Sequence, residues 1–437
     1  MFKWNEADLE ARLCRALDIA NKTIRYFAQE GYTDKESPVY GFGPEKPIAE
    51  TAMLLYAASA RPHQPREITD RIEAIAHTLQ QHARSERVLI DIALHPSLAF
   101  KFAVPHILLT KLGYPDERFD RFLVTCAAAQ ASGGRDRPPS AAVERRWISS
   151  LWNGHEDASG WRRDLRDSVL NRPLDILSGL RDDVYAFTHL MLYVTGFGFR
   201  VQPLPRSRKV ILAEAGSLLA RYLDMEDYDL AGEILLAWPL IGSPWNVAAA
   251  FGFRVLANVE DEVGVLPCGN VNVDRLRALD GEARSRYALG ISYHTAYVMG
   301  FLSAACLRPG RAPPTRIAGP TQARIRPHRI LDRISDDQGH WQSVFDKLSD
   351  HEQQALIPFL RDVALIQSCR RHDYEGMRQI LKTAAELDIT PSPASVQAIE
   401  LLARIAHCAS VIGARVPPAS TPPASTNEER EKKTGVG

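Results

Sequence analysis

Apolar residues recur every three or four positions along almost the whole chain, and this helical period is the feature that most restricts its fold. From Leu9 to Phe27 they form one apolar stripe, which Gly31 ends. Pro47 stands where a proline in the first turn of a helix would, and opens a second helix through Ala60. Further helices are expected at 66–83, 96–112, 116–131, 141–152, 182–195, 206–223, 226–240, 245–259 and 284–306. No run alternates between apolar and polar residues as a strand would, so the sequence predicts an all-α protein.

The expected helices differ in how much of their surface is apolar. Those at 47–60, 182–195, 226–240 and 284–306 are apolar on nearly all faces, whereas those at 66–83 and 206–223 have a polar face. Such alternation is typical of two concentric layers, as in α/α toroids, and an open array of helical hairpins would give much the same pattern. We therefore expect an all-helical α/α domain over residues 1–307, either toroid-like or a helical-hairpin array.

A basic, proline-rich stretch follows this domain. We expect a linker over 308–340, a small C-terminal helical segment over 341–413, and a disordered tail over 414–437, where Pro-Pro-Ala-Ser-Thr occurs twice. The C-terminal helices are expected at Trp341–Ile366, His372–Leu387 and Ser395–Ile412. The stretch Arg308–Arg333 holds many arginines and a single acid, Asp332, and is either a solvated connector or an arm that docks a protein partner.

The charges of the chain balance. Lys+Arg and Asp+Glu both number 53 among the 437 residues, so the formal net charge is zero. Nucleic-acid binders and proteins that bind anionic membranes rely on excess positive charge, so we expect neither kind of partner. The N-terminus lacks an apolar signal-peptide core, and no stretch reaches about 18 continuous apolar residues, which predicts a soluble cytoplasmic protein. The six cysteines form no C-x-x-C pair and are interpreted as free thiols.

Two of the apolar helices carry a histidine followed by a similar string. His189 precedes Tyr193 and His294 precedes Tyr297, and a Val-x-Gly-Phe string follows each tyrosine. Buried polar groups must be paired or have a role, because an unpaired one costs roughly 1–3 kcal/mol. The two histidines are either core residues tied to neighbouring helices or part of the lining of a central cavity. In the second case, the four residues line that cavity, with the two imidazoles within about 8 Å of each other.

Other candidate residues lie in similar surroundings. Glu233 and Glu50 each lie in an apolar run, where a carboxylate is salt-bridged or has a raised pKa that suits general acid catalysis. Asp183 is a further candidate acid, although the helix dipole also favours an acid in a first turn. His106 is a third candidate inward histidine. No compact motif such as H-E-x-x-H is present, so a divalent metal ion, if it is the cofactor, would need ligands from distant helices, with His106, His189 and His294 as candidates.

Glycines interrupt the two histidine-bearing helices. Gly196, Gly290 and Gly300 lie within or at the ends of these helices, and each would cost about 1 kcal/mol relative to alanine at an interior position. Their presence indicates close helix packing or room for a ligand. The P-loop motif, a strand-linked G-x-G-x-x-G and G-x-S-x-G are all absent from the sequence. Their absence argues against the usual NTPase, dinucleotide-binding and α/β-hydrolase functions.

The strings Asp182–Gly198, Asp229–Leu240 with Phe251–Arg254, and Tyr293–Gly300 resemble an uncharacterised all-helical family of high-GC, actinobacterial-type bacteria. Its members are often encoded near natural-product biosynthesis enzymes. The resemblance covers roughly residues 5–307. It implies a role in specialised metabolism, such as antibiotic biosynthesis, and no activity that could be carried over to particular residues.

Two functions remain open. The first is an enzyme that acts on a small-molecule or carrier-bound substrate in a central cavity, with His189 and His294 as acid/base groups or ligands. The second is a non-catalytic helical scaffold that binds a protein partner through its concave surface or the arginine-rich arm. In an enzyme, replacing either histidine by glutamine should abolish activity at a cost under about 1.5 kcal/mol, whereas a structural histidine should cost more.

Overall fold

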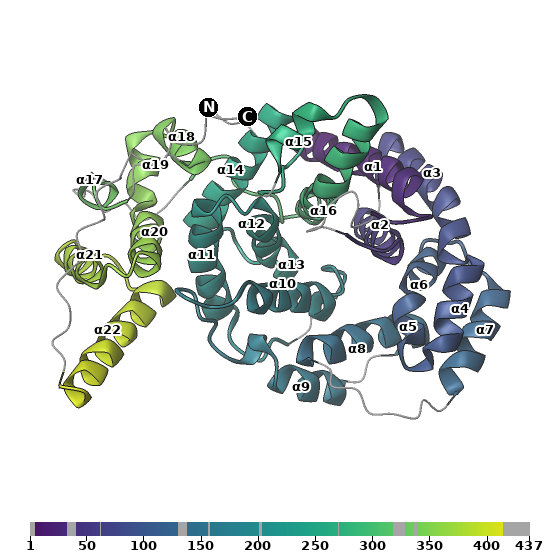
Figure 1. Ribbon diagram of the computed structural model, residues 1–437, viewed down its shortest axis with the longest axis horizontal. Helices are drawn as coiled ribbons and strands as arrows, with labels where there is room; N and C mark the ends of the chain where they lie inside the picture. The colour runs from purple at the N-terminus through teal and green to yellow at the C-terminus, as the bar shows by residue number, and fades with distance from the viewer. Residues whose placement is uncertain are drawn as a thin grey trace, which may run out of the picture.

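The computed structural model describes residues 5–32, 41–61, 63–129, 138–155, 158–200, 203–269, 271–317, 328–334 and 339–413. Over these residues it confirms that the chain is all-α, and the only β pairing there is a single antiparallel bridge between Tyr32 and Phe42 (Figure 1). None of the helices in these ranges is long and apolar enough to cross a membrane. All six cysteines lie in the described ranges, and each is a free thiol.

Six helices follow one another around the middle of the molecule, and each packs against the next. They are α2 (Glu45–Ala58), α6 (Val104–Lys111), α8 (Pro139–Asn153), α10 (Arg181–Thr195), α12 (Tyr228–Leu235) and α16 (Gly281–Cys306). The series of contacts closes on itself because α16, the last of the six, also packs against α2, the first (Figure 1). Side chains that are far apart in the sequence are thereby brought together between these inner helices.

Other helices cover the outside of the inner six. They include α1 (Glu6–Phe27), α3 (Arg66–Ala83), α4 (Glu86–Leu94), α5 (Ala99–Phe102), α7 (Glu117–Ala128), α9 (Ala158–Arg166), α11 (Arg208–Asp224) and α14 (Val247–Val263). The first of them, α1, packs along α16 and α2, whereas α11 and α14 pack on α12. This layering explains why every residue of α12 is buried, while α3 buries only one stripe of its surface.

Prolines divide three of the predicted helices. Segment 226–240 forms α12 and α13 (Ala237–Ile241), because Pro239 lacks the N–H that would bond to the carbonyl of Leu235. Segment 96–112 forms a 3₁₀ turn at Pro96–Leu98 followed by α5 and α6, and Pro105 lies in the first turn of α6. The predicted span 341–366 contains α18 (His340–Asp346), α19 (Asp350–Ala355) and the start of α20 (Ile357–Arg370), which opens on Pro358. The short helices α4, α9, α15 (Val273–Ala278) and α17 (His328–Leu331) were not predicted, and α17 lies within the predicted linker.

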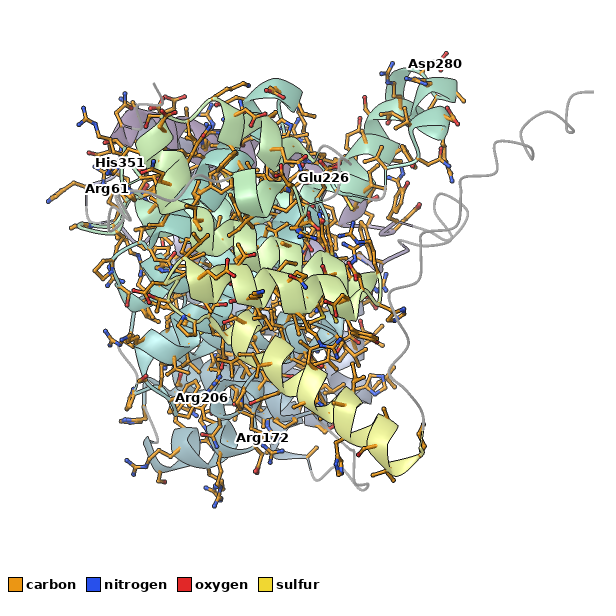
Figure 2. The ribbon with its side chains drawn as sticks, turned by 90° about the vertical axis from the view of Figure 1, so that its left-hand side faces the viewer. Arg61, Arg172, Arg206, Glu226, Asp280 and His351 are labelled. Carbon is orange, nitrogen blue, oxygen red and sulfur yellow. The ribbon has the colours of Figure 1, made fainter. Side chains whose placement is uncertain are left out.

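The C-terminal helices pack on the outer side of α11 and α14. Figure 2 looks onto these helices, and the turn at Asp280 before α16 projects beyond them. Arg254 of α14 pairs with Glu352 of α19 at 2.9 Å, and Ser217 of α11 donates a hydrogen bond to Asp362 of α20 at 2.7 Å. The segment ends with α21 (Tyr374–Glu386) and α22 (Pro393–Val411), and its apolar side chains belong to the same core cluster as those of the inner helices.

The start of the predicted linker lies against the domain surface. The guanidinium of Arg308 lies over the ring of Phe199, 4.5 Å from its centre, and burial lowers the pKa of Arg308 to about 10. Arg311 donates to the carbonyl of Pro239 and accepts a hydrogen bond at its own carbonyl from Trp245. Both arginines therefore contact other residues of the domain. Residues 318–327 and 335–338 of the linker and the predicted tail at 414–437 lie outside the described residues.

Candidate functional site

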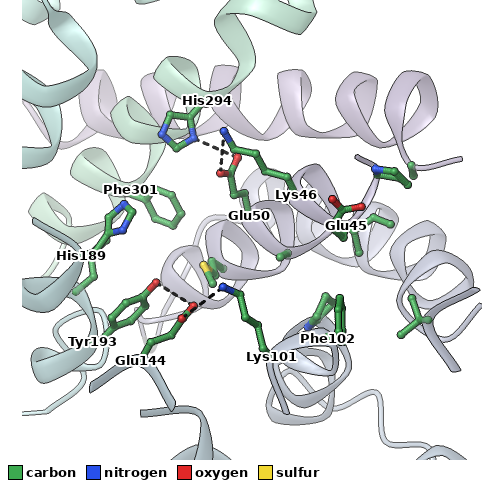
Figure 3. Close-up of a pocket in the computed structure, with 18 of the residues that line it drawn as sticks. Glu45, Lys46, Glu50, Lys101, Phe102, Glu144, His189, Tyr193, His294 and Phe301 are labelled. Carbon is green, nitrogen blue, oxygen red and sulfur yellow. Dashed lines mark hydrogen bonds and ion pairs between the residues drawn. The ribbon is translucent and has the colours of Figure 1, made fainter. Parts of the chain in front are cut away.

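A cavity of about 330 Å³ lies among the inner helices (Figure 3). Its volume falls in the range of roughly 300–1,000 Å³ that is typical of small-molecule pockets. Most of its surface is apolar, and the walls include Ile48, Met53, Leu192, Leu236, Val298 and Phe301. Charged and polar side chains from α2, α4, α5, α8, α10, α12 and α16 supply most of the rest of the lining. The cavity therefore combines an apolar body with a few polar groups, as ligand sites usually do.

Both predicted histidines line this cavity and approach the same carboxylate. Nε2 of His189 lies 3.7 Å from Oε1 of Glu233, and Nε2 of His294 lies 3.5 Å from that same oxygen. The three residues come from α10, α16 and α12, so the packing of three inner helices places them together. We conclude that the two similar sequence strings supply two imidazoles to one cluster.

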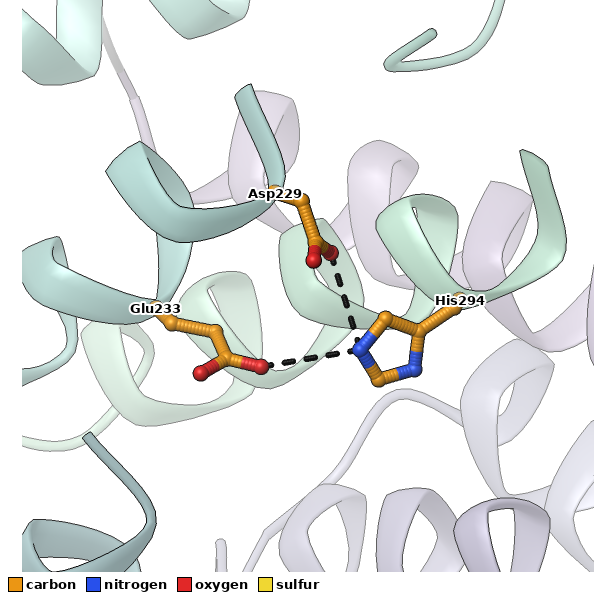
Figure 4. A group of neighbouring side chains, drawn as sticks. All are labelled: Asp229, Glu233 and His294. Carbon is orange, nitrogen blue, oxygen red and sulfur yellow. Dashed lines mark ion pairs between the residues drawn. The ribbon is translucent and has the colours of Figure 1, made fainter. Parts of the chain in front are cut away.

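His294 faces two more carboxylates. Its Nδ1 lies 3.1 Å from Oε2 of Glu50, and its Nε2 lies 3.6 Å from Oδ1 of Asp229 (Figures 3 and 4). Glu50 also lies 3.9 Å from the ammonium of Lys46, one turn earlier on α2. His294 is thus enclosed by acidic groups from two helices, one on each side of its ring. We call the five residues of this group the cluster: Glu50, His189, Asp229, Glu233 and His294.

The carboxylates of α12 are oriented by hydroxyl groups of α10. Tyr185 donates a hydrogen bond to Oδ2 of Asp229 at 2.6 Å, and Thr188 donates one to Oε2 of Glu233. Asp229 and Glu233 are four residues apart and therefore share one face of α12. Each carboxylate thus uses one oxygen for α10 and turns its other oxygen toward His294.

A second polar group stands at another part of the cavity wall. Tyr193 donates to Glu144 of α8 at 3.4 Å, and Lys101 of α5 lies 3.8 Å from the other oxygen of Glu144 (Figure 3). Tyr185, His189 and Tyr193 are spaced four residues apart and follow one face of α10. Gly196 then ends the helix with φ +52°, a left-handed conformation that glycine adopts readily, and the chain turns Phe197 onto the cavity.

A second cavity, of about 800 Å³, meets the first at the cluster. Lys46, Glu50, His189 and His294 line both cavities. The second cavity is more polar, and charged residues such as Arg181, Glu226 and Asp227 belong to its lining. The imidazoles are therefore accessible from an apolar side and from a polar side.

The charges of the cluster shift the pKa values of its members. Burial alone would lower the pKa of His294, but Glu50 and Asp229 raise it well above its ordinary value. Burial would raise the pKa of Glu233, yet the two histidines lower it. The pKa of Asp229 is raised, chiefly because burial disfavours its charged form. The cluster thus holds carboxylates whose pKa values are pushed in opposite directions, a common property of functional sites.

Three predicted site residues lie away from the cavity. Tyr297 is fully buried, and its hydroxyl lies 2.7 Å from that of Thr51, so it joins α16 to α2. Asp183 is exposed in the first turn of α10, where an acid complements the helix dipole. His106 is 0% exposed and is held in the outer core by Arg84 and Asp120, so it is not a third inward histidine.

Gly290 and Gly300 of α16 allow close contacts with neighbouring segments. A Cβ at Gly300 would lie 2.6 Å from Cβ of Ala16, and one at Gly290 would lie 2.7 Å from the ring of Tyr32. Gly300 therefore leaves no room for a ligand, whereas Gly290 also borders the second cavity.

Sequence analysis missed several residues of the site. Asp229, Tyr185, Lys46, Lys101 and Glu144 were not selected as site residues. The spacing of Asp229 and Glu233 offered a signal, because two acids four residues apart on an otherwise apolar helix must share one buried face. Glu144 gave no such signal, since Arg145 and Arg146 follow it directly. Lys101 is the single charged residue in the apolar run Leu98–Val104, and this signal was not used.

The comparisons with known proteins give one match. The model of a family described as "Domain of unknown function (DUF6895)" matches residues 13–304. The matched range includes α2 through nearly all of α16, and therefore every residue of the cluster. No curated protein and no solved structure matches the chain.

Proposed function

Since the chain belongs to the family described as a domain of unknown function (DUF6895), whose description names no activity, we propose its function from the site alone. The protein is an enzyme that acts on a small-molecule or carrier-bound substrate in the central cavity. One observation carries this proposal: two imidazoles and a buried carboxylate converge on one wall of a mostly apolar cavity. Acid/base and ligand roles require this kind of convergent geometry.

Each polar group has a distinct place in the proposed site. His189 and Glu233 can exchange a proton with a substrate at the end of the cavity, because their polar atoms are close together and border the open volume. Glu50 pairs with His294 through its Nδ1 at 3.1 Å. Lys101, whose ammonium is paired with Glu144 beside Tyr193, supplies hydrogen-bond donors at a separate point of the wall. This separation suits a substrate with two polar ends.

The lining also indicates the class of substrate. Aliphatic and aromatic side chains make up most of the wall, so the body of the substrate is apolar. Its reacting group is polar and lies against the cluster. We carry over from the sequence resemblance the further proposal that the enzyme belongs to bacterial specialised metabolism.

The proposal is tested by turnover of metabolites. The purified full chain is incubated with a bacterial metabolite extract, and mass spectrometry identifies the compounds that are consumed and formed. We expect His189→Gln, His294→Gln and Glu233→Gln to lower the conversion by about 100-fold or more, the usual contribution of a positioned acid or base. Asp183→Asn, on the exposed face of α10, is the matched control and should convert the same compounds as the wild type.

The alternative function, a non-catalytic scaffold for a protein partner, gives the opposite result. A scaffold needs no convergent polar groups in a cavity. The wild type and the three variants would then all leave the metabolite extract unchanged. Conversion that persists in all three cluster variants would also contradict the proposed enzyme site.

A further inference from the structure

Three potential ligand atoms point at one another at the junction of the two cavities. They are Oδ1 of Asp229, Oε1 of Glu233 and Nε2 of His294, and all lie within 4.8 Å of one another (Figure 4). The imidazole nitrogen is 3.6 Å and 3.5 Å from the two oxygens. These separations are too long for hydrogen bonds. They match the spacing of about 3.4 Å that bonds of about 2.1 Å to one tetrahedral ion impose on its ligands.

Other residues lie against the remaining polar atoms of the three side chains. Tyr185 and Thr188 bond to the second oxygens of Asp229 and Glu233, and Glu50 faces the second nitrogen of His294. Metal-ligating histidines usually donate their other N–H to a carboxylate, and ligating carboxylates are themselves hydrogen-bonded. The surroundings of the three ligand atoms are therefore those of a metal centre.

Asp229 supplies an independent observation. The residue is only 8% exposed, yet its Oδ1 accepts no hydrogen bond from any residue that the structure describes. A buried carboxylate oxygen without such a partner is costly. Its position beside Nε2 of His294 means that a cation between the two would satisfy both atoms.

We propose that Asp229, Glu233 and His294 bind a divalent transition-metal ion. The donor set, one imidazole nitrogen and two carboxylate oxygens, suits Zn²⁺ and related first-row ions. The two carboxylates balance the charge of the ion, while Glu50 is balanced by Lys46. Three protein ligands leave an open position, as in catalytic zinc sites, and His189 lies beside Glu233 at the cavity.

This inference deepens the proposed function, because the ion would lie at the same cluster, but it can be tested without turnover. The full chain is freed of metal with a chelator and titrated with Zn²⁺ by calorimetry. Co²⁺ is added in a parallel experiment, because its absorption spectrum reports the coordination geometry. We expect saturable binding of one ion per chain.

Conservative variants locate the site. Glu233→Gln and Asp229→Asn keep the side-chain volume and remove a charged ligand, and we expect each to weaken Zn²⁺ binding by at least about 100-fold. Glu50→Gln acts through His294 and should weaken binding by about 10–100-fold. Glu144→Gln, a carboxylate of the same cavity outside the cluster, is the matched control and should bind as the wild type does.

A second measurement needs no variant. Diethyl pyrocarbonate modifies accessible imidazoles, and mass spectrometry locates the product. We expect Zn²⁺ to protect His294 from modification while leaving an exposed histidine such as His407 reactive. Equal modification of His294 with and without Zn²⁺, or no saturable binding by the wild type, would overturn the metal site.

The two proposals fail separately. If the wild type binds the metal ion but converts no substrate, the metal site stands and the proposed enzyme function is wrong. If the wild type converts a substrate but binds neither Zn²⁺ nor Co²⁺, the proposed metal site is wrong. The enzyme then works with an ion-paired acid/base cluster.

Discussion

At the scale of single residues, the three candidate histidines differ in what their ring nitrogens contact. Both nitrogens of His106 are occupied, by Arg84 at 3.1 Å and by Asp120 at 2.7 Å. His294 uses Nδ1 for Glu50 and turns Nε2 to the cluster, and His189 reaches Glu233 from the cavity wall. The sequence shows all three in apolar segments and therefore does not separate them.

Substitution by glutamine should distinguish the structural histidine from a cavity histidine. His106→Gln disturbs two buried hydrogen bonds and should lower the free energy of unfolding by roughly 1–3 kcal/mol, without changing substrate conversion. His189→Gln, at a half-buried position, should cost under about 1.5 kcal/mol and abolish conversion. Urea denaturation and the conversion assay measure both. A larger loss of stability for His189→Gln than for His106→Gln would reverse these assignments.

His106 should also make stability depend on pH. Burial lowers its pKa below the ordinary value of 6.5, although Asp120 opposes this effect. Below about pH 6.5, the unfolded chain therefore takes up a proton that the folded protein does not. The stability that neutral His106 contributes is complete above that pH and is lost as the pH falls toward the folded pKa.

The variant His106→Gln isolates this contribution, because glutamine does not titrate. We expect the difference in unfolding free energy between wild type and His106→Gln to shrink as the pH falls from about 7.5 to about 5. Denaturation curves at several pH values measure it. A difference that stays constant or grows toward low pH would mean that His106 is charged in the folded protein.

At the scale of elements, the glycines of two helices should respond differently to alanine. Gly300→Ala places a Cβ 2.6 Å from Ala16 and 2.9 Å from Leu54, so α16 must move away from α1 and α2. We expect a loss of about 1–3 kcal/mol, the usual cost of overpacking a core. Gly216→Ala in α11 has no neighbour closer than 3.5 Å and should stabilise the protein by about 0.5–1 kcal/mol.

Thermal and urea denaturation of the two glycine variants provide the comparison. A stabilised Gly300→Ala protein would contradict the close packing of α16 on α1 and α2.

The positions of most elements could be predicted because their apolar stripes are local signals. The points at which prolines divide a predicted helix into two were harder to predict. Pro239 and Pro358 interrupt apolar runs that otherwise read as single helices, and the effect depends on where each proline falls within a turn. The helix α4 was missed because Ile90 and Leu94 are exposed on it, which blurs the stripe.

At the scale of the whole molecule, the C-terminal helices share buried polar contacts with the outer helix α11. Arg361 is 1% exposed and donates to Asp362, and Asp362 also accepts a hydrogen bond from Ser217 of α11. Removing one partner of a buried ion pair costs about 3–5 kcal/mol, because the other charge stays buried. The stability of the C-terminal segment is thus coupled to that of α11.

Asp362→Ala tests this coupling. We expect the wild type to unfold in one cooperative transition and the variant to unfold in one transition at a clearly lower urea concentration. Glu375→Ala, at an exposed position of α21, should leave the midpoint nearly unchanged. Two transitions, of which only one shifts in Asp362→Ala, would show that the C-terminal segment unfolds independently.

The all-α class could be predicted from the sequence, but the closure of the inner helices could not. Closure depends on α16 packing against α2, and no local pattern in either helix indicates that contact. The cluster has the same origin, because Glu50, Glu233 and His294 lie on three such helices. Sequence reasoning found both histidines and Glu233 as buried polar residues, and it could not show that they meet.

The place of α16 in the chain also has a consequence for biosynthesis. This helix, the last of the inner six to leave the ribosome, packs against α1 and α2, which emerge first. Until about three hundred residues have been translated, the apolar faces of the first two helices lack their final partner. Nascent chains that stop before Gly281 should therefore need chaperones or aggregate, because exposed apolar surface makes incomplete chains associate. Such chains would also lack His294, which lies on α16, and would therefore have no complete cluster.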